Sequence, residues 1–341
     1  MPNAVGPPLP DSRSASPEEG PTETMPNRRS LKILIAVAKI AVVGACFAYV
    51  AFVISRNLED LRQTEFKLRL VPLLASFPFA VAYLFGRGMI WHLIVRKVVG
   101  RFPLRTDLLS WMSSLLGKYI PGKVFLLFGR MYFYRGSGAR AAEVSLGFLI
   151  ESCCSGLATL IIFGFAIAWR NDVALGAFKP AMAALAVVLL AATHPIILRF
   201  GINTALRLTH RPAVEFRPRW RDILGWTLLM ATNWLVLGAG FYLLLWSLID
   251  IPFTLYPFVT GAFAVAGIVG ILALFAPSGL GVREGVMTFV LSAVLSAGVA
   301  GVAAILARVW MTLAEALCSG VALLMVRGMK FEPPVAAEQP D

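Results

Sequence analysis

The sequence is poor in charged residues, which make up only 15% of its 341 residues. A soluble domain of ordinary composition has about 25% charged residues, so this chain lacks the polar surface that such a domain needs. Hydrophobic residues make up 58% of the chain, and the mean hydropathy is +0.76. These values predict an all-α polytopic membrane protein, because long apolar runs cross a bilayer as helices.

Acidic residues, cysteines and histidines are also few, and each shortage excludes a class of function. The 31 basic residues outnumber the 19 acidic ones and gather in loops beside apolar runs, a pattern that indicates membrane orientation before nucleic-acid binding. The four cysteines lie within apolar stretches, so we expect them to pack and not to form disulfides. The three histidines are isolated, and no serine elbow, kinase motif or P-loop appears. We therefore expect no metal, no cofactor and no catalytic residue.

The chain divides into a tail, a membrane domain and a second short tail. Residues 1–30 are rich in Pro, Ser, Glu and Gly and have almost nothing to bury, which predicts a disordered cytoplasmic tail. Residues 31–326 form one helical membrane domain, and residues 327–341 form a short C-terminal tail. The first apolar run is longer than a secretory signal and starts late, so a retained span is expected, with a cleaved signal as the alternative.

Seven apolar windows are long enough to cross a bilayer, and two further regions are not. We expect about 6–8 transmembrane helices in all, together with two broken or re-entrant hairpins. The predicted spans are 31–55, 70–95, 141–169, 177–198, 222–249, 256–276 and 300–326. The misfit regions are 107–134, whose apolar halves are each too short to cross, and 277–298, which begins with PSGLGVREG. If 277–298 is part of a hairpin, residues 256–276 form its first arm.

Loop charge predicts the orientation of the spans. Residues 96–105 are basic with no acid, and 199–221 contain six arginines against Glu215 alone, whereas 248–256 contain no Lys or Arg. The first two segments are therefore predicted to be cytoplasmic loops, with the N-terminus inside. This orientation is typical of a multi-pass protein of the cell (inner) membrane.

The two misfit regions have similar surroundings, which predicts inverted repeats over 70–169 and 222–326. In each half a tryptophan precedes a proline by 30 or 31 residues, and that proline precedes an intramembrane charge by the same interval. The landmarks are Trp91, Pro121 and Glu151 in the first half, and Trp246, Pro277 and Arg308 in the second. Because the two tryptophan spans run in opposite directions by the charge argument, the hairpins are expected to enter from opposite faces.

Proline and glycine at the two breaks predict a hydrated cavity, because unsatisfied backbone groups cost several kcal/mol in lipid. The predicted hairpin-break residues are Pro121, Gly122, Pro277, Gly279 and Gly281. A helix that restarts after a break favours phosphate or carboxylate at its N-terminus. The candidate head-group ligands are Lys118, Lys123, Arg130 and Arg283, and the intramembrane charges are Glu151, Glu284 and Arg308.

Each of these charges also has a structural alternative. The basic residues near the first break also fit snorkelling or positive-inside positions, and Arg283 with Glu284 fits a charge pair at a helix N-terminus. Glu151 and Arg308 are predicted to pair with each other, or Arg308 to pair with Glu315, which lies seven residues further on the same helix face. No role is assigned to Arg87.

The motifs GKYIPGKVFLLFGR at 117–130, LIESCC around Glu151, PSGLGVREG at 277–285 and ILARVW around Arg308 resemble the lysylphosphatidylglycerol synthase transmembrane-region family. This is the flippase-like membrane domain of the multiple peptide resistance factor, and it also occurs in stand-alone proteins. The resemblance covers about 31–326, although the family more often has Gly where this chain has Ser278.

The resemblance implies translocation of a phospholipid or lipid-linked head group across the cytoplasmic membrane. The bifunctional relatives also have a soluble aminoacyltransferase domain, which this sequence does not contain, so enzyme activity is not expected. The implied partners are membrane lipids, anionic or phosphate-bearing, and a separate lipid synthase or glycosyltransferase. The alternatives are an integral lipid-modifying enzyme that uses Glu151 or Glu284 as acid or base, and a non-catalytic partner of such a synthase.

Overall fold

Every regular element that the structure describes is a helix. This computed structural model describes residues 44, 48–49, 51–119, 124–134, 139–170, 180, 184, 187–188, 190–191, 194–208, 218–273 and 276–327. Within these ranges there is no strand, so the chain is an all-α polytopic membrane protein, as its composition predicted.

Five of the described helices are long and apolar enough to cross a membrane. They are α3 (Leu70–Val98), α6 (Ala141–Arg170), α10 (Trp220–Trp246), α11 (Tyr256–Leu272) with the short η2 (Phe253–Leu255) before it, and α13 (Ala297–Arg327). Each corresponds to a predicted span. The predicted spans 31–55 and 177–198 lie largely outside the described residues, and so do both predicted tails. Residues 51–56 are helical and precede α2 (Leu58–Gln63).

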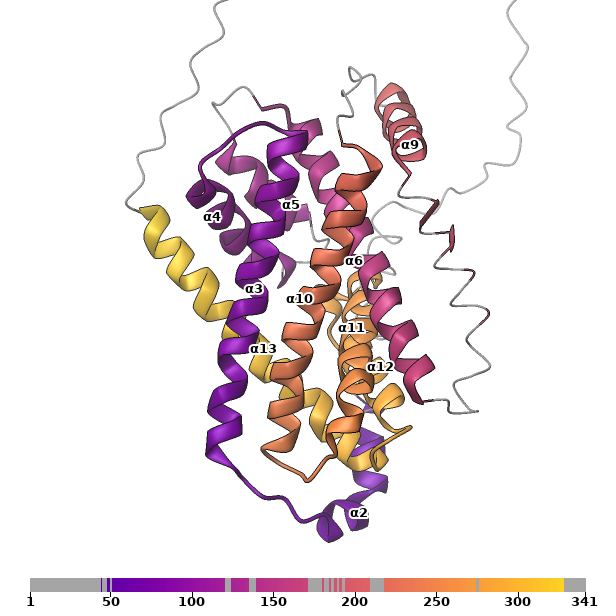
Figure 1. The fold of residues 1–341 in the computed structure, drawn as a ribbon. Helices are drawn as coiled ribbons and strands as arrows, with labels where there is room; N and C mark the ends of the chain where they lie inside the picture. Colours follow the sequence, from indigo (N-terminus) through magenta and orange to yellow (C-terminus); the bar gives the residue numbers. More distant parts are fainter. Residues whose placement is uncertain are drawn as a thin grey trace, which may run out of the picture. The chain divides into compact units, whose positions relative to one another are not determined.

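The long helices pack closely where their contact faces carry small residues. α10 packs against both α3 and α6, and the three run side by side (Figure 1). A Cβ atom added to Gly240 of α10 would lie 2.9 Å from the carbonyl oxygen of Ser76 in α3, so only glycine allows this approach. Asn233 donates a hydrogen bond of 3.0 Å to the backbone carbonyl of Tyr83, which supplies a polar tie between the same two helices.

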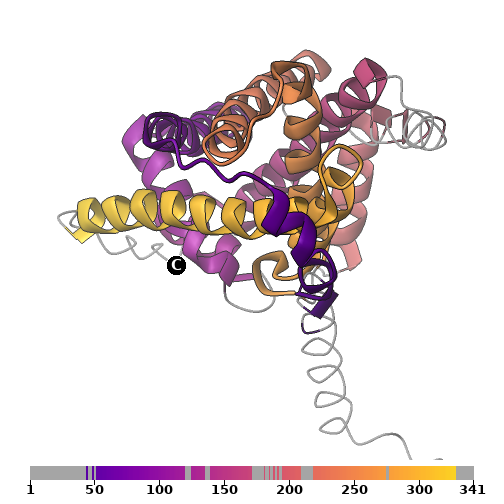
Figure 2. The ribbon, with the colours of Figure 1, turned by 90° about the horizontal axis from the view of Figure 1, so that it is seen from below.

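The two misfit regions form helical hairpins. The first contains α4 (Leu104–Ser114), the 3₁₀ segment η1 (Leu115–Tyr119) and α5 (Val124–Phe133), and α4 packs against α5. The second contains α11, the 3₁₀ turn η3 (Pro277–Gly279) and α12 (Val282–Leu291), and α11 packs against α12. The segments η1 and η3 contact each other, so the interrupted parts of the two hairpins meet. Helix α13 is inclined across the bundle and also contacts η1 (Figure 2).

Two predicted boundaries differ from the structure. Residues 199–221 were predicted to be a loop, but α9 (Pro195–Leu208) occupies its first part, because proline is favoured in the first turn of a helix and the next thirteen residues contain no further proline. The helix predicted over 282–298 ends at Leu291, and α13 begins at Ala297. Ser296 precedes α13 and accepts the backbone N–H of Ala300 on its carbonyl oxygen, which starts the new helix.

Candidate functional site

The second hairpin break has a backbone that favours glycine. The φ angle is +67° at Gly279 and +79° at Gly281, both in the left-handed region. A Cβ atom added to Gly279 would lie 2.6 Å from the carbonyl oxygen of Gly270, so the break packs directly against the backbone of α11. Ser278 has a φ of +53°, a conformation that a non-glycine residue adopts at some cost. The turn is therefore retained where the family more often has glycine.

Glu284 and Arg308 fix the start of α12. The Glu284 carboxylate accepts the backbone N–H of Gly281 at 2.7 Å and lies 3.3 Å from Nη1 of Arg308. The same nitrogen of Arg308 donates to the carbonyl oxygen of Ser278 at 3.1 Å. Nη2 of Arg308 is buried and has no acceptor among the residues that the structure describes. Arg308 thus joins the Ser278 carbonyl to the Glu284 carboxylate, and its Nη2 donor has no acceptor among the described residues.

The residues just before the first break contact Glu315 of α13, the helix that also carries Arg308. Lys118 forms an ion pair with Glu315, and the Tyr119 hydroxyl donates to the same carboxylate at 2.7 Å. Arg308 and Glu315 are seven residues apart on α13, and so lie on one face of it. Through these two residues α13 contacts both hairpins at the point where η1 and η3 meet.

Among the described residues, Arg283 is a cation at this junction without a carboxylate partner. Its guanidinium carbon lies 4.6 Å from the ring centroid of Phe263, and within the described ranges it makes no hydrogen bond or ion pair. A Cβ atom added to Gly270 of α11 would lie 3.1 Å from Cβ of Arg283, so this side chain packs where α12 begins beside the break. We call Lys118, Arg283, Glu284, Arg308 and Glu315 the break cluster. It contains three cations and two carboxylates, which leaves one positive charge without compensation.

A second group of charges, the Glu151 cluster, consists of Glu151, Arg87 and Arg130. The Glu151 carboxylate lies 2.9 Å from Arg87, pairs with Arg130, and accepts the indole N–H of Trp111 at 3.0 Å. The guanidinium carbon of Arg130 lies 4.3 Å from the centroid of the Trp91 ring, and its side chain is only 3% exposed. This cluster joins α3, α5 and α6, and no buried donor in it lacks a partner.

The structure therefore brings together some of the predicted residues and separates others. Lys118, Arg283, Glu284 and Arg308 meet at the breaks, whereas Glu151 and Arg130 pair with each other elsewhere. Neither of the predicted partners of Arg308 is correct, because it pairs with Glu284. Pro121, Gly122 and Lys123 lie outside the described residues, and so does the side chain of Pro277.

Sequence reasoning gave no functional role to Arg87 or Glu315, yet each completes a cluster. Each is an ionisable side chain inside an apolar helix, and such a residue nearly always has a partner or faces a cavity. The sequence therefore indicated that each residue has a partner. It did not indicate which partner, because Arg87 pairs with a residue 64 positions away and Glu315 with one 197 positions away.

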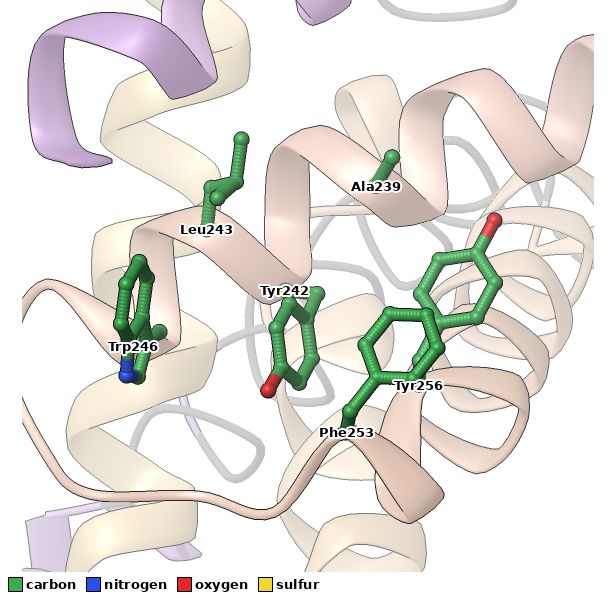
Figure 3. Close-up of a pocket in the computed structure, with 6 residues that line it drawn as sticks. All are labelled: Ala239, Tyr242, Leu243, Trp246, Phe253 and Tyr256. Carbon is green, nitrogen blue, oxygen red and sulfur yellow. The ribbon is translucent and has the colours of Figure 1, made fainter.

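An apolar recess of about 570 Å³ lies apart from both clusters. Figure 3 shows its lining, which comes from the last turns of α10 and from η2 and α11: Ala239, Tyr242, Leu243, Trp246, Phe253 and Tyr256. The hydroxyls of Tyr242 and Tyr256 donate to the backbone carbonyls of Ile251 and Leu235 at 3.0 and 2.9 Å. With these donors occupied, the recess suits an apolar group.

The fold and the paired breaks define a polytopic helical membrane protein whose broken hairpins meet around buried charges. The model of the family described as the lysylphosphatidylglycerol synthase TM region matches residues 33–317, and the chain belongs to that family. This confirms the resemblance predicted from the motifs and relates the chain to lipid modification or flipping. The comparison with curated proteins gave no match.

Proposed function

We propose that the protein translocates a phospholipid or lipid-linked head group across the cytoplasmic membrane, and that the head group binds at the break cluster. The observation that carries this proposal is Arg283, a cation beside two hairpin breaks with no carboxylate partner in the described chain. An unpaired charge at membrane depth is costly and is retained where it has a ligand. A phosphate group supplies the missing charge and accepts from a guanidinium in bidentate geometry.

The surroundings of Arg283 favour the same ligand. The N-terminus of α12 points its free backbone N–H groups and the positive end of its dipole toward the break. Nη2 of Arg308 offers a further buried donor, and the side chain of Lys118 is 20% exposed. We assign head-group contact to Arg283 and Lys118. Arg130 is enclosed within the Glu151 cluster, so we assign it to helix packing.

The direction of insertion follows from loop charge. Helix α3 ends in Arg96 and Lys97, at the start of the basic segment 96–105. Under the positive-inside rule this end of α3 is cytoplasmic, which supports our proposal of an N-terminal tail inside and a location in the cell (inner) membrane.

The test is lipid translocation in liposomes that contain the purified protein. A fluorescent phosphatidylglycerol is placed in both leaflets, and its accessibility to a membrane-impermeant quencher is followed with time. We expect Arg283→Gln to slow translocation about tenfold or more, because a charge-assisted hydrogen bond contributes about 1.5–3 kcal/mol. Arg283→Lys keeps the charge and is expected to retain part of the rate.

Arg221→Gln is the matched control, because Arg221 is an exposed arginine in the first turn of α10. Equal rates for Arg283→Gln and the unmodified protein would contradict the proposal and favour a non-catalytic partner. A new lipid species in the mass spectrum would instead indicate a lipid-modifying enzyme.

A further inference from the structure

We infer that the head group crosses as a single negative charge without a proton or metal ion, so that the membrane potential drives it toward the outer leaflet. This inference rests on the proposed function and adds its energy source and direction. It follows from how the charges around the breaks are paired.

The break cluster can receive an anion without a co-transported cation. Its two carboxylates are matched by Lys118 and Arg308, and Arg283 remains as one uncompensated positive charge. One phosphodiester group would neutralise that charge. A site that was neutral before binding would require the anion to bring a cation with it, because an uncompensated charge is costly in low dielectric.

The carboxylates in the described membrane part of the chain are all occupied by donors. Glu284 has Arg308 and the N–H of Gly281, and Glu315 has Lys118 and the Tyr119 hydroxyl. Each of these two carboxylates thus already accepts from a cation and from a further donor. The break cluster therefore has no vacant base to take up a proton together with the lipid.

Two further acidic groups, Glu151 of α6 and Asp107 of α4, pair with side chains of α3. Glu151 is shared by two arginines, and Asp107 accepts the Tyr134 hydroxyl at 2.8 Å and lies 2.6 Å from Nδ1 of His92. In the described ranges no three His, Cys, Asp or Glu residues gather in a group that could hold a metal ion. A proton carried with the lipid would have to break one of these pairs, because each of these four acidic side chains already has a donor among the described residues.

The charge that crosses the membrane determines how unevenly the potential distributes the lipid between the two leaflets. The protein charges stay in place, so the potential acts on the charge of the head group alone. One elementary charge gives an equilibrium bias of about fifty-fold for each roughly 100 mV. An inside-negative potential thus favours the outer leaflet, whatever the orientation of the protein in the bilayer.

The experiment separates the electrical gradient from the pH gradient. Liposomes with the protein and a fluorescent phosphatidylglycerol receive a potassium diffusion potential set with valinomycin, at equal pH on both sides. We expect the probe to accumulate in the leaflet on the positive side and to reverse its distribution when the potential is reversed. A pH gradient at zero potential should leave the distribution even.

Two results would overturn the inference while the proposed function stands: translocation with the same distribution at every potential, or a distribution that follows the pH gradient. Absence of protein-dependent translocation under all gradients would instead contradict the proposed function.

Discussion

The Glu151 cluster and the break cluster are both buried groups of charges, yet their donors are satisfied differently. In the Glu151 cluster two arginines share one carboxylate, and hydroxyls and aromatic rings complete their contacts; Arg87, for example, donates to Ser155 at 2.9 Å. In the break cluster, within the described residues, the Arg283 guanidinium lies over the Phe263 ring and makes no hydrogen bond or ion pair, and Arg308 keeps a buried donor without an acceptor.

This difference separates charges that hold helices together from charges that can take a ligand. A buried ion pair with all its donors satisfied gains nothing from a ligand, and breaking it leaves an uncompensated charge. An unpaired cation at a backbone break gains its compensation when an anion binds. Both clusters contain one cation more than carboxylates, so what distinguishes them is that each arginine of the Glu151 cluster contacts a carboxylate whereas Arg283 contacts none among the described residues.

The largest effect on stability is expected for Glu151→Gln. This change removes the single carboxylate that faces Arg87 and Arg130, and it leaves two buried guanidinium groups without a counter-charge. We expect the free energy of unfolding to fall by about 3–5 kcal/mol, the usual cost of removing one partner of a buried pair. Thermal unfolding of the purified protein in detergent measures it.

Glu143→Gln is the matched control on the same helix. Glu143 lies in the first turn of α6 and pairs at 2.8 Å with Arg140, whose side chain is 48% exposed, so little change is expected. If the two variants unfolded at the same temperature, the Glu151 cluster would not be structural and the contrast between the clusters would fail.

The helices of this fold were largely predictable, because apolar runs of sufficient length leave one solution in lipid. The second break was also predictable, because Pro277 and the glycines after it cannot continue a helix. The exception is α9, where an arginine-rich segment that indicated a loop contains a helix exposing Ile196 and Phe200.

The pairing of charges was not predictable from the sequence. Arg308 and Glu315 share one face of α13, which indicated a pair within the helix. Their actual partners come from two different hairpins, because η1 and η3 approach α13 together. Long-range packing decides this geometry, and no local pattern encodes it. The unpaired state of Arg283 could be recognised only after the other charges had found their partners.

A smaller effect on stability is expected for Gly279→Ala, which tests the backbone of the break. Alanine at a φ of +67° costs about 1–2 kcal/mol, and its Cβ would meet the carbonyl oxygen of Gly270 at 2.6 Å. We expect unfolding at a lower temperature, together with slower lipid translocation because Arg283 is displaced. Gly164→Ala in α6 is the control, since an added Cβ there meets nothing within 4 Å. Unchanged stability and rate in Gly279→Ala would show that the break tolerates another backbone.

The smallest effect on stability is expected at an exposed ion pair, which extends the comparison from the two buried clusters to charges in contact with water. Hydrogen bonds from Arg69 and Lys67 lower the pKa of Asp250, and the bond to Asp250 raises the pKa of Lys67. A lowered carboxyl pKa stabilises the folded state at pH values above the ordinary pKa of aspartate. This contribution to stability is lost as the pH falls through the lowered pKa. The Lys67 contribution is present below the ordinary lysine pKa and is lost as the pH rises through its raised value.

Asp250→Asn should therefore lower stability slightly between these limits and flatten the acid limb of the unfolding profile. The effect stays small because water screens the carboxylate, which is 62% exposed. The backbone N–H groups of Lys67 and Arg69 also hold this segment against Leu248 and Ser247, at 2.9 and 2.8 Å, whatever the charge at Asp250. Thermal unfolding from acid to neutral pH measures the difference. A loss as large as that of Glu151→Gln would mean that exposure does not separate weak pairs from strong ones in this protein.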